Sequence, residues 1–250
     1  MNAYEMNTRV PFYLCDENFN LRLDGYLKLF TESSVLQTNE KEDIKRESER
    51  WIIYKWDVEI IREAYWNDSL RVVTFARKII GFYAYRNFLI YRGDELIARA
   101  DTIWLLIGSD GSIKKIPKDL AQYYGSTTEE EDKYVKKTKK NNIKILDKYD
   151  YSYPIYIRAS DLDYNEHVNN TNYLLYVMDA FKDLEGYIFS DIRIIFKRQI
   201  KYDEKIRLYY QYENKEDGKL YLYFIIKNNE DEIKTMGNII WKEKDQVREK

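Results

Sequence analysis

The hydrophobic and polar positions in the first half of the chain predict a strand, a long helix and then four strands. Between residues 21 and 37, apolar side chains recur at the spacing of one helix face. Strand-like alternation precedes this helix at residues 9–14 and returns after it in four runs bounded by turn residues. These runs cover residues 51–61, 69–75, 82–91 and 96–107.

The second half of the chain repeats this order. A strand, a helix and four further strands are predicted at residues 153–159, 169–184, 187–199, 204–214, 219–227 and 232–243. Short runs match between the halves: Leu14-Cys15-Asp16 resembles Ala159-Ser160-Asp161, and Tyr26-Leu27 resembles Tyr173-Leu174. Internal similarity over this length predicts a duplicated domain.

Each half is therefore expected to be an α+β unit, in which one long helix covers the apolar face of a mostly antiparallel sheet. The predicted boundaries are residues 1–125 for the first unit and residues 150–250 for the second. Residues 126–149 carry an acidic run followed by lysines, and we interpret them as a solvated connector.

Composition narrows the possible classes of function. The net charge is −2, so no broad basic surface is expected and nucleic acid is not an expected partner. The first residues lack the basic segment and apolar core of a signal peptide, and no run approaches the ~18 apolar residues of a membrane span. Cys15 is the only cysteine, which excludes an intrachain disulfide and fits a reducing cytoplasm. One cysteine and one histidine cannot supply a usual zinc site, so no metal is expected.

The only histidine, His167, lies where residues capable of chemistry are most concentrated. Asp161, Asp163 and Asn165 precede it at a spacing of two, and the predicted helix follows it. Histidine titrates near neutral pH, and a neighbouring carboxylate can hold its tautomer or stabilise its cation. A lone histidine is more often structural, but the acid, amide and imidazole together at a helix start favour an active site.

The start of this helix offers a place for a developing oxyanion. Asn169 or Asn170 is a suitable N-cap, because the side-chain oxygen can accept an N–H of the first turn. Unpaired N–H groups near Val168, Asn169 and Asn170 could polarise a carbonyl oxygen.

The two halves are not expected to be chemically equal. Alignment of Asp16 with Asp161 places Asn18, Asn20 and Arg22 at the positions of the later acid, amide and imidazole. The first half then lacks an acid–imidazole pair. We therefore predict one active site, in the second half, and a non-catalytic first half.

The segment 161–173 closely resembles the second-half motif of the acyl-acyl-carrier-protein (acyl-ACP) thioesterases of plants and bacteria. That motif is similar to Asp-Leu-Asp-x-Asn-x-His-Val-Asn-Asn-x-x-Tyr, and the chain carries every fixed position of it. The resemblance covers nearly the whole chain and implies a tandem hotdog fold, in which each sheet wraps around a central helix. It also implies that Asp163, Asn165 and His167 are catalytic and that the first half shapes the acyl pocket.

One position departs from the family pattern. The family often carries an acid, sometimes followed by cysteine, in the strand after the catalytic helix, and Gln199 and Ile200 occupy these positions here. Glutamine can orient a water or a carbonyl but cannot accept a proton at pH 7. Gln199 is therefore assigned an auxiliary role, and the base role moves toward Asp163 or His167. Whether Asp163 acts as base or as nucleophile stays open.

The resemblance implies hydrolysis of fatty acyl-ACP thioesters to free fatty acid and ACP, which ends chain elongation. The alternatives are an acyl-CoA thioesterase on the same fold, a non-hydrolytic acyl-binding protein and a hotdog dehydratase. No cofactor is expected, since the phosphopantetheine arm belongs to the substrate. A cytoplasmic monomer or homodimer is expected, and no acyl chain length can be inferred.

Two further groups of residues are candidates for contacts with such a substrate. ACP is acidic, so a basic docking patch is expected; its candidates are Lys197, Arg198 and Lys201. One face of the first helix is a candidate wall of the acyl pocket, although the same stripe could be ordinary core. Its residues are Leu23, Leu27, Phe30 and Ser34.

Overall fold

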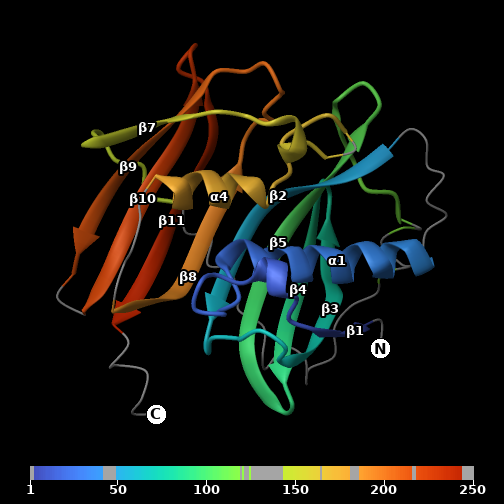
Figure 1. Cartoon of the computed structure of the whole chain (residues 1–250). Helices are drawn as coiled ribbons and strands as arrows, with labels where there is room; N and C mark the ends of the chain where they lie inside the picture. Colours follow the sequence, from blue (N-terminus) through green and yellow to red (C-terminus); the bar gives the residue numbers. More distant parts are fainter. Residues whose placement is uncertain are drawn as a thin grey trace. The chain divides into compact units, whose positions relative to one another are not determined.

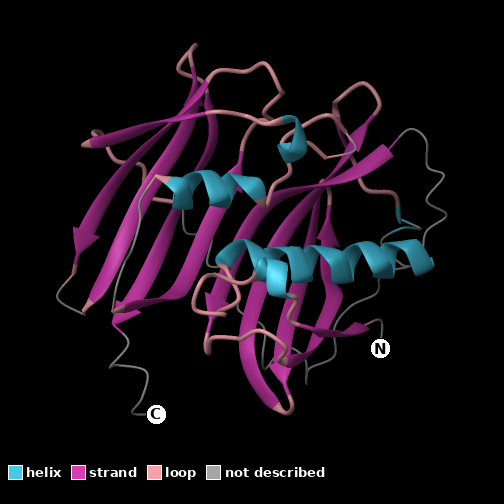
Figure 2. Cartoon of the chain, in the orientation of Figure 1, coloured by secondary structure: helices cyan, strands magenta, loops and turns pink. Residues whose placement is uncertain are grey.

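The computed structural model describes residues 3–41, 49–118, 120, 124, 143–163, 165–180, 186–215 and 218–243. The chain divides into two compact units, Met1–Lys139 and Lys140–Lys250. Most of the expected connector, residues 126–142, lies outside the described residues. Strands predominate in both units (Figure 2).

The first unit is built on an antiparallel sheet in the order β1-β3-β4-β5-β2. Its strands are β1 (Tyr4–Arg9), β2 (Glu49–Ile60), β3 (Ser69–Ile80), β4 (Tyr83–Arg92) and β5 (Glu95–Gly108), and the short β6 (Ile113–Lys114) pairs with β5. The helix α1 (Leu23–Lys41) lies across one face of this sheet (Figure 1). A 3-10 helix, η1 (Phe12–Leu14), lies between β1 and α1.

The packing of α1 on this sheet is apolar. Leu27 and Phe30 are fully buried. The ring of Phe30 lies 6.0 Å from the ring of Trp56 on β2 and 5.3 Å from the ring of Phe88 on β4. Burial contributes about 1.5–3 kcal/mol for each side chain of this size, so these contacts hold the helix, and the loop before it, in place.

The second unit repeats the topology, with an antiparallel sheet in the order β7-β9-β10-β11-β8. Its strands are β7 (Tyr151–Ile155), β8 (Tyr187–Phe196), β9 (Ile206–Asn214), β10 (Lys219–Asn228) and β11 (Ile233–Glu243). A 3-10 helix, η2 (Ala159–Asp161), precedes α4 (Asn172–Asp179), which lies against this sheet (Figure 1). The predicted α+β class is confirmed.

Two of the expected strands are misplaced. The runs at residues 9–14 and 153–159 end as strands at Arg9 and Ile155, and a 3-10 helix follows in each unit. In the first unit the reason is Pro11, which has no N–H to donate to a neighbouring strand. Its carbonyl instead accepts the N–H of Leu14 at 3.1 Å and closes the 3-10 turn.

The helices also differ from their expected bounds. The first helix begins two residues later than expected, and it continues to Lys41. The second begins at Asn172 instead of residue 169, and residues 181–185, at the expected end, lie outside the described residues. Among the described residues, no helix is both long enough and apolar enough to cross a membrane.

Candidate active site

The loop that carries His167 is a tight turn between η2 and α4. The N–H of Asp163 donates to the carbonyl of His167 at 2.7 Å, and the N–H of Glu166 donates to the carbonyl of Asp163 at 3.0 Å. Glu166 has a φ of 61°, in the left-handed region that side-chain-bearing residues seldom occupy. Such a conformation costs about 1–3 kcal/mol and persists only where the surrounding structure determines it.

The Asp163 carboxylate folds back onto this turn. Its Oδ1 accepts the N–H of Asn165 at 2.8 Å and the N–H of His167 at 3.4 Å, and its Oδ2 lies 3.5 Å from Nδ2 of Asn165. Hydrogen bonds from backbone N–H groups to a carboxylate are strong and directional. The structure thus brings the predicted acid, amide and histidine into one loop.

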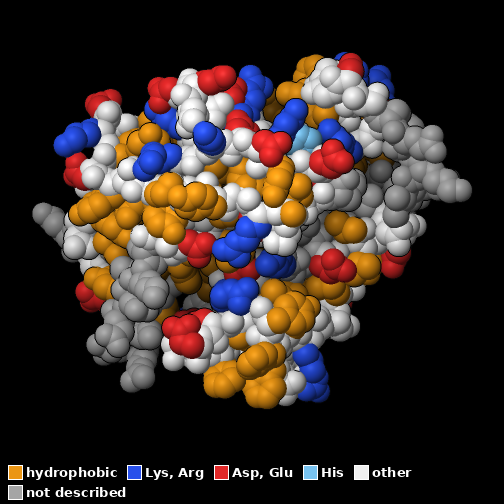
Figure 3. Space-filling view, turned by 45° about the horizontal axis from the view of Figure 1, so that its top comes forward, with side chains coloured by type: hydrophobic (Ala, Val, Ile, Leu, Met, Phe, Trp, Pro, Cys, Tyr) orange, Lys and Arg blue, Asp and Glu red, His pale blue; other side chains and the backbone are white. Residues whose placement is uncertain are grey.

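The imidazole of His167 is partly exposed, and Figure 3 shows it in pale blue at the surface with basic and acidic side chains beside it. Its Nδ1 is buried and has no hydrogen-bond partner among the described residues. In the described part of the chain, no hydrogen bond joins the imidazole to the Asp163 carboxylate. The expected contact between acid and imidazole is therefore not formed.

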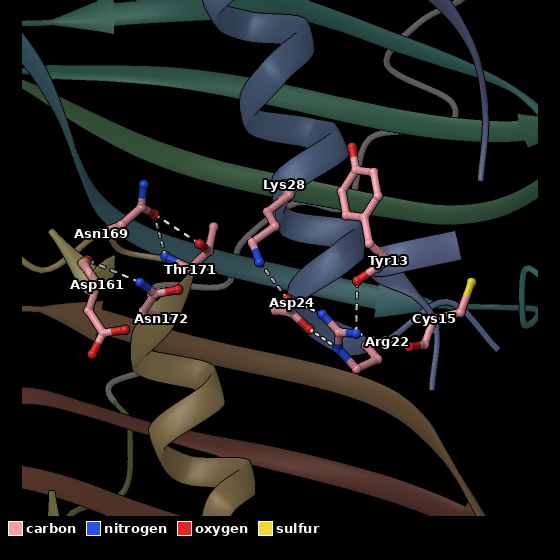
Figure 4. Close-up of polar contacts among 9 residues, drawn as sticks. All are labelled: Tyr13, Cys15, Arg22, Asp24, Lys28, Asp161, Asn169, Thr171 and Asn172. Carbon is pink, nitrogen blue, oxygen red and sulfur yellow. Dashed lines mark hydrogen bonds and ion pairs between the residues drawn. The ribbon is translucent and has the colours of Figure 1, made fainter. Parts of the chain in front are cut away.

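Asp161 ties the loop to α4. Its carboxylate accepts the hydroxyl of Tyr176 at 2.7 Å and the N–H of Arg158 at 2.8 Å. Its carbonyl accepts the N–H of Asn169 at 2.8 Å and Nδ2 of Asn172 at 3.0 Å (Figure 4). These contacts fix both ends of the loop that carries His167 against one helix.

Tyr176 is a residue that the sequence analysis missed. Burial, together with the hydrogen bond to Asp161, raises the pKa of its hydroxyl, so the hydroxyl stays protonated and donates. The only signal in the sequence is its position three residues after Tyr173, on the same face of the helix.

The cap of α4 differs from the prediction. The N-cap is Thr171 instead of Asn169 or Asn170, and its side chain makes no capping hydrogen bond. The Asn169 side-chain oxygen accepts the N–H of Thr171 at 3.0 Å and its hydroxyl at 2.9 Å (Figure 4). The asparagine therefore shapes the turn before the helix and does not cap the first turn itself.

Two of the three expected oxyanion donors are already occupied. The N–H of Val168 donates to the carbonyl of Ile200 at 2.9 Å, and the N–H of Asn169 donates to Asp161. Within the described residues, the N–H of Asn170 donates no hydrogen bond. Of the expected set, Asn170 is the donor that remains open beside the start of α4.

Gln199 does not lie in a strand, as was expected. The strand β8 ends at Phe196, and Gln199 is exposed in the loop that follows, without a hydrogen bond to any described residue. The next residue, Ile200, is buried, and its N–H faces the hydroxyl of Tyr173. Ile200 therefore anchors this loop to α4, while the amide of Gln199 stays in solvent.

The expected docking residues Lys197, Arg198 and Lys201 are all exposed in this same loop. Nε of Arg198 lies 3.2 Å from Glu232, a surface pair that contributes little to stability. Lys201 forms an antiparallel bridge with His167 through the backbone. Their contact with an acidic partner stays a prediction.

The four expected pocket residues, Leu23, Leu27, Phe30 and Ser34, are buried, with at most 3% of their surface exposed. Phe30 belongs to the aromatic packing of the first unit, and the hydroxyl of Ser34 donates to the carbonyl of Thr31 at 2.7 Å. They pack as core residues in this structure, and a role in an acyl pocket stays a prediction.

The first unit contains a second copy of the loop. The N–H of Asp16 donates to the carbonyl of Asn20 at 2.9 Å, and its Oδ1 accepts the N–H of Asn18 at 2.9 Å and that of Asn20 at 2.8 Å. The N–H of Phe19 donates to the carbonyl of Asp16 at 3.1 Å, and Phe19 has a φ of 63°. This is the hydrogen-bond pattern of the loop that carries the histidine.

The predicted alignment of the two halves is therefore wrong by two residues in this loop. Asp16 corresponds to Asp163 and not to Asp161, and Asn20 corresponds to His167. The first copy keeps the acid and the first amide and lacks only the imidazole. That the first half is non-catalytic stays a prediction.

Three charged side chains, Arg22, Asp24 and Lys28, form an ion cluster at the start of α1 (Figure 4). Asp24 is buried and bonds to Nε of Arg22 at 2.9 Å and to Nζ of Lys28 at 2.7 Å. Arg22 also donates to the carbonyls of Tyr13 and Cys15. Burial raises the pKa of the Asp24 carboxyl, but the hydrogen bonds from Arg22 and Lys28 outweigh burial and hold the pKa below its usual value.

Over the described ranges, no three His, Cys, Asp or Glu side chains are grouped so that they could hold a metal ion. The expectation that the site works without a metal or cofactor stays a prediction. The groups available for chemistry are thus one imidazole, one carboxylate, one amide and the N–H groups at the start of α4.

Comparison with known proteins places these features in context. The family profile "Acyl-ACP thioesterase N-terminal domain" matches residues 1–124, and "Acyl-ACP thioesterase C-terminal domain" matches residues 145–243. A chloroplastic oleoyl-acyl carrier protein thioesterase of Coriandrum sativum is 25% identical over 171 residues, which are 62% of this chain and 45% of that protein. The match thus spans less than half the length of that relative.

Solved structures show the same fold. A 12:0-ACP thioesterase from Umbellularia californica has a TM-score of 0.83 at 16% identity and covers 97% of this chain and 95% of its own. An acyl-ACP thioesterase from Bacteroides thetaiotaomicron has a TM-score of 0.81 at 13% identity, with coverages of 96% and 98%. This likeness confirms the predicted tandem hotdog fold.

Proposed function

Because the chain belongs to the acyl-ACP thioesterase family, we propose that it hydrolyses fatty acyl-ACP thioesters to free fatty acid and ACP. The observation that carries this proposal is the site in the second unit. There the single imidazole of the chain, His167, is partly exposed and lies in the loop that leads into α4.

The groups of this loop match the needs of thioester hydrolysis. Nε2 of His167 takes a proton from a water molecule, whose oxygen forms a bond to the thioester carbon. The carbonyl oxygen then carries negative charge, which the N–H of Asn170 and the positive end of α4 stabilise; one such donor is typically worth about 10²–10³ in kcat. The intermediate collapses with cleavage of the carbon–sulfur bond, and the imidazolium returns its proton to the leaving thiolate.

The substrate proposal has consequences for the partner. The acyl chain arrives on the phosphopantetheine arm of ACP, so no further cofactor is needed. The acidic carrier would contact the exposed residues Lys197, Arg198 and Lys201, which lie in the loop that is joined to His167 by the backbone bridge of Lys201. We propose a cytoplasmic enzyme that acts as a monomer or a homodimer.

The test is release of free fatty acid from acyl-ACP and acyl-CoA of several chain lengths. His167→Ala should lower kcat by about 10²-fold or more, the loss expected for a general base. The matched control is Asn20→Ala at the equivalent position of the first unit, which should keep the wild-type kcat. If the wild type releases no acid from any thioester but retains acyl chains, the protein is a non-hydrolytic acyl-binding protein. Equal kcat/KM on both classes of ester would favour the acyl-CoA alternative.

A further inference from the structure

We propose that Asp163 is a positioning residue, which shapes the catalytic loop through its hydrogen bonds to backbone N–H groups, and that the imidazole of His167 alone moves the proton in hydrolysis. This inference rests on the proposed function and assigns the roles within its site. It answers the question that the sequence left open, which was whether the acid is a base or a nucleophile.

The first argument comes from the duplicated loop in the first unit. Asp16 accepts the N–H groups two and four residues later at 2.9 and 2.8 Å, and Asp163 accepts the corresponding groups at 2.8 and 3.4 Å. The two residues with left-handed φ, Phe19 and Glu166, also occupy the same place in the turn. The first copy has no imidazole, so its carboxylate cannot serve an acid–imidazole pair. What the two acids share is therefore the shape of the turn.

The second argument comes from the carboxylate itself. Oδ1 of Asp163 accepts two backbone N–H groups of the turn, so this oxygen is already engaged in holding the loop. Its Oδ2 has only the long contact to Asn165 at 3.5 Å. Oδ2 is thus the one atom through which Asp163 could act on a substrate, and asparagine at this position replaces one carboxylate oxygen with a neutral NH2 group.

The third argument comes from the orientation of the imidazole. Neither ring nitrogen of His167 bonds to the Asp163 carboxylate among the described residues, and the buried Nδ1 has no hydrogen-bond partner among them. The contact between the two residues runs instead from the backbone N–H of His167 to the acid. Asp163 therefore acts on the imidazole through the backbone that carries it.

Asparagine at position 163 separates the two roles. Asp163→Asn keeps a side-chain oxygen for the N–H groups of Asn165 and His167, and it removes the charge and the second oxygen. Asp163→Ala removes the acceptor as well. The matched controls are Asp16→Asn and Asp16→Ala, which make the same changes in the loop without an imidazole.

The experiment measures kcat, KM, the pH profile of kcat and Tm for the four variants and the wild type, with an acyl-ACP that the wild type hydrolyses. Asp163→Asn should keep kcat within about 10-fold of the wild type, with the same pH profile, because the general base is unchanged, whereas Asp163→Ala should lose about 10²-fold or more. Both Asp16 variants should keep the wild-type kcat. Tm should fall in both alanine variants and stay near that of the wild type in both asparagine variants.

Two results would overturn the inference. One is a loss of ~10²-fold or more in Asp163→Asn at an unchanged Tm, which would show that the charge itself is needed for catalysis. The other is a wild-type kcat in Asp163→Ala. If Asp163→Ala does not fold, the asparagine variant alone decides between the two roles.

Amide hydrogen exchange keeps this inference separate from the proposed function. If the wild type is inactive on every thioester, the proposed hydrolysis fails, but the role of Asp163 in shaping the loop can still be tested. The amides of Asn165 and His167 should exchange faster in Asp163→Ala than in Asp163→Asn. Equal exchange in the two variants would overturn the inference.

Discussion

Two buried tyrosine hydroxyls should contribute similarly to stability but differently to activity. The hydroxyl of Tyr26 accepts the N–H of Ala64 at 2.8 Å and lies 3.5 Å from the carbonyl of Arg62. The hydroxyl of Tyr173 faces the N–H of Ile200. Burial raises the pKa of both hydroxyls, so both stay protonated at neutral pH.

The size of the effect follows from burial. Tyr26→Phe and Tyr173→Phe keep the ring in the core and remove only the oxygen. Ala64 and Ile200 are 0% exposed, so neither abandoned N–H can turn to water. An unsatisfied buried N–H costs about 1–3 kcal/mol. For a chain of this length each kcal/mol lowers Tm by about 2–4 °C, so each variant should melt roughly 2–12 °C below the wild type.

Activity should distinguish the two variants. The carbonyl of Ile200 holds the N–H of Val168, the residue after His167, at 2.9 Å. The carbonyl of Ala64 holds Leu21 at 2.8 Å in the loop that lacks an imidazole. A loosened Ile200 should displace the loop that carries His167. A displacement near 1 Å in an active site can cost about 10²-fold, so Tyr173→Phe should lower kcat while Tyr26→Phe keeps it.

Thermal unfolding followed by circular dichroism and steady-state release of fatty acid at 25 °C measure the two effects. A Tm equal to that of the wild type in Tyr26→Phe would show that the hydroxyl does not stabilise the fold. Equal losses of kcat in both variants would show a general effect of lowered stability and would refute the link between Ile200 and the loop that carries His167.

Further predictions concern the core, the ion cluster and the exposed loop. Phe30→Ala should destabilise by about 3–5 kcal/mol in a denaturant titration without changing chain-length preference; a changed preference at wild-type stability would instead place the ring in an acyl pocket. Asp24→Asn should lower the free energy of unfolding at pH 7 by about 1.5–3 kcal/mol, the value of hydrogen bonds to a charged group. The folded pKa of Asp24 lies below its unfolded value. The stability advantage of the wild type is therefore present above the unfolded pKa and is lost as pH falls through the folded one, so the difference in Tm should narrow as the pH is lowered into the acid range. A difference that persists in acid would contradict this. Gln199→Ala should keep kcat near the wild-type value, and a loss of ~10²-fold would restore a catalytic role for this side chain. Lys197→Glu combined with Lys201→Glu should raise KM for acyl-ACP and leave KM for the neutral acyl-pantetheine unchanged; an equal rise for both would argue against docking of the carrier here.

The elements of the core were predictable because their burial repeats at the period of the secondary structure. Phe30 belongs to the apolar face of a helix, and Trp56 to the apolar face of a strand. Both are buried where α1 meets the sheet. The prediction of a strand through Pro11 was wrong because the pattern of apolar residues does not show whether each backbone N–H can pair with a neighbouring strand. A 3-10 turn satisfied that backbone locally instead.

The two-residue error in the alignment has a simple origin. The match of Tyr26 with Tyr173 gives the correct difference in residue number between the two halves within the helix. Extended backwards without a gap, the same offset pairs Asp16 with Asp163. The match of Asp16 with Asp161 came from residue identity alone. The hydrogen bonds of the turn show which residues of the two loops correspond. In both copies the carboxylate stands where it accepts backbone N–H groups of its own turn.

The occupancy of the expected oxyanion donors could not be predicted from the local sequence. The N–H of Val168 is taken by the carbonyl of Ile200, which lies in a different loop. A pattern of residues around the helix start contains no information about that carbonyl. For the same reason the exposure of Gln199 and the contact between Asp161 and Tyr176 emerge only in three dimensions.

Comparison of the two loops also shows how the imidazole lowers the stability of its turn. In the first copy, Nδ2 of Asn20 lies 3.3 and 3.2 Å from the two oxygens of Asp16, so a hydrogen bond between side chains also holds the turn. In the second copy the imidazole of His167 does not make this hydrogen bond to the acid, and its buried Nδ1 has no partner among the described residues. An unsatisfied buried nitrogen costs about 1–3 kcal/mol. The left-handed residue is present in both copies and cannot account for this difference. This destabilisation lies at the position where the first copy has Asn20 and the second has His167, and such a local cost is expected where a residue serves function instead of stability.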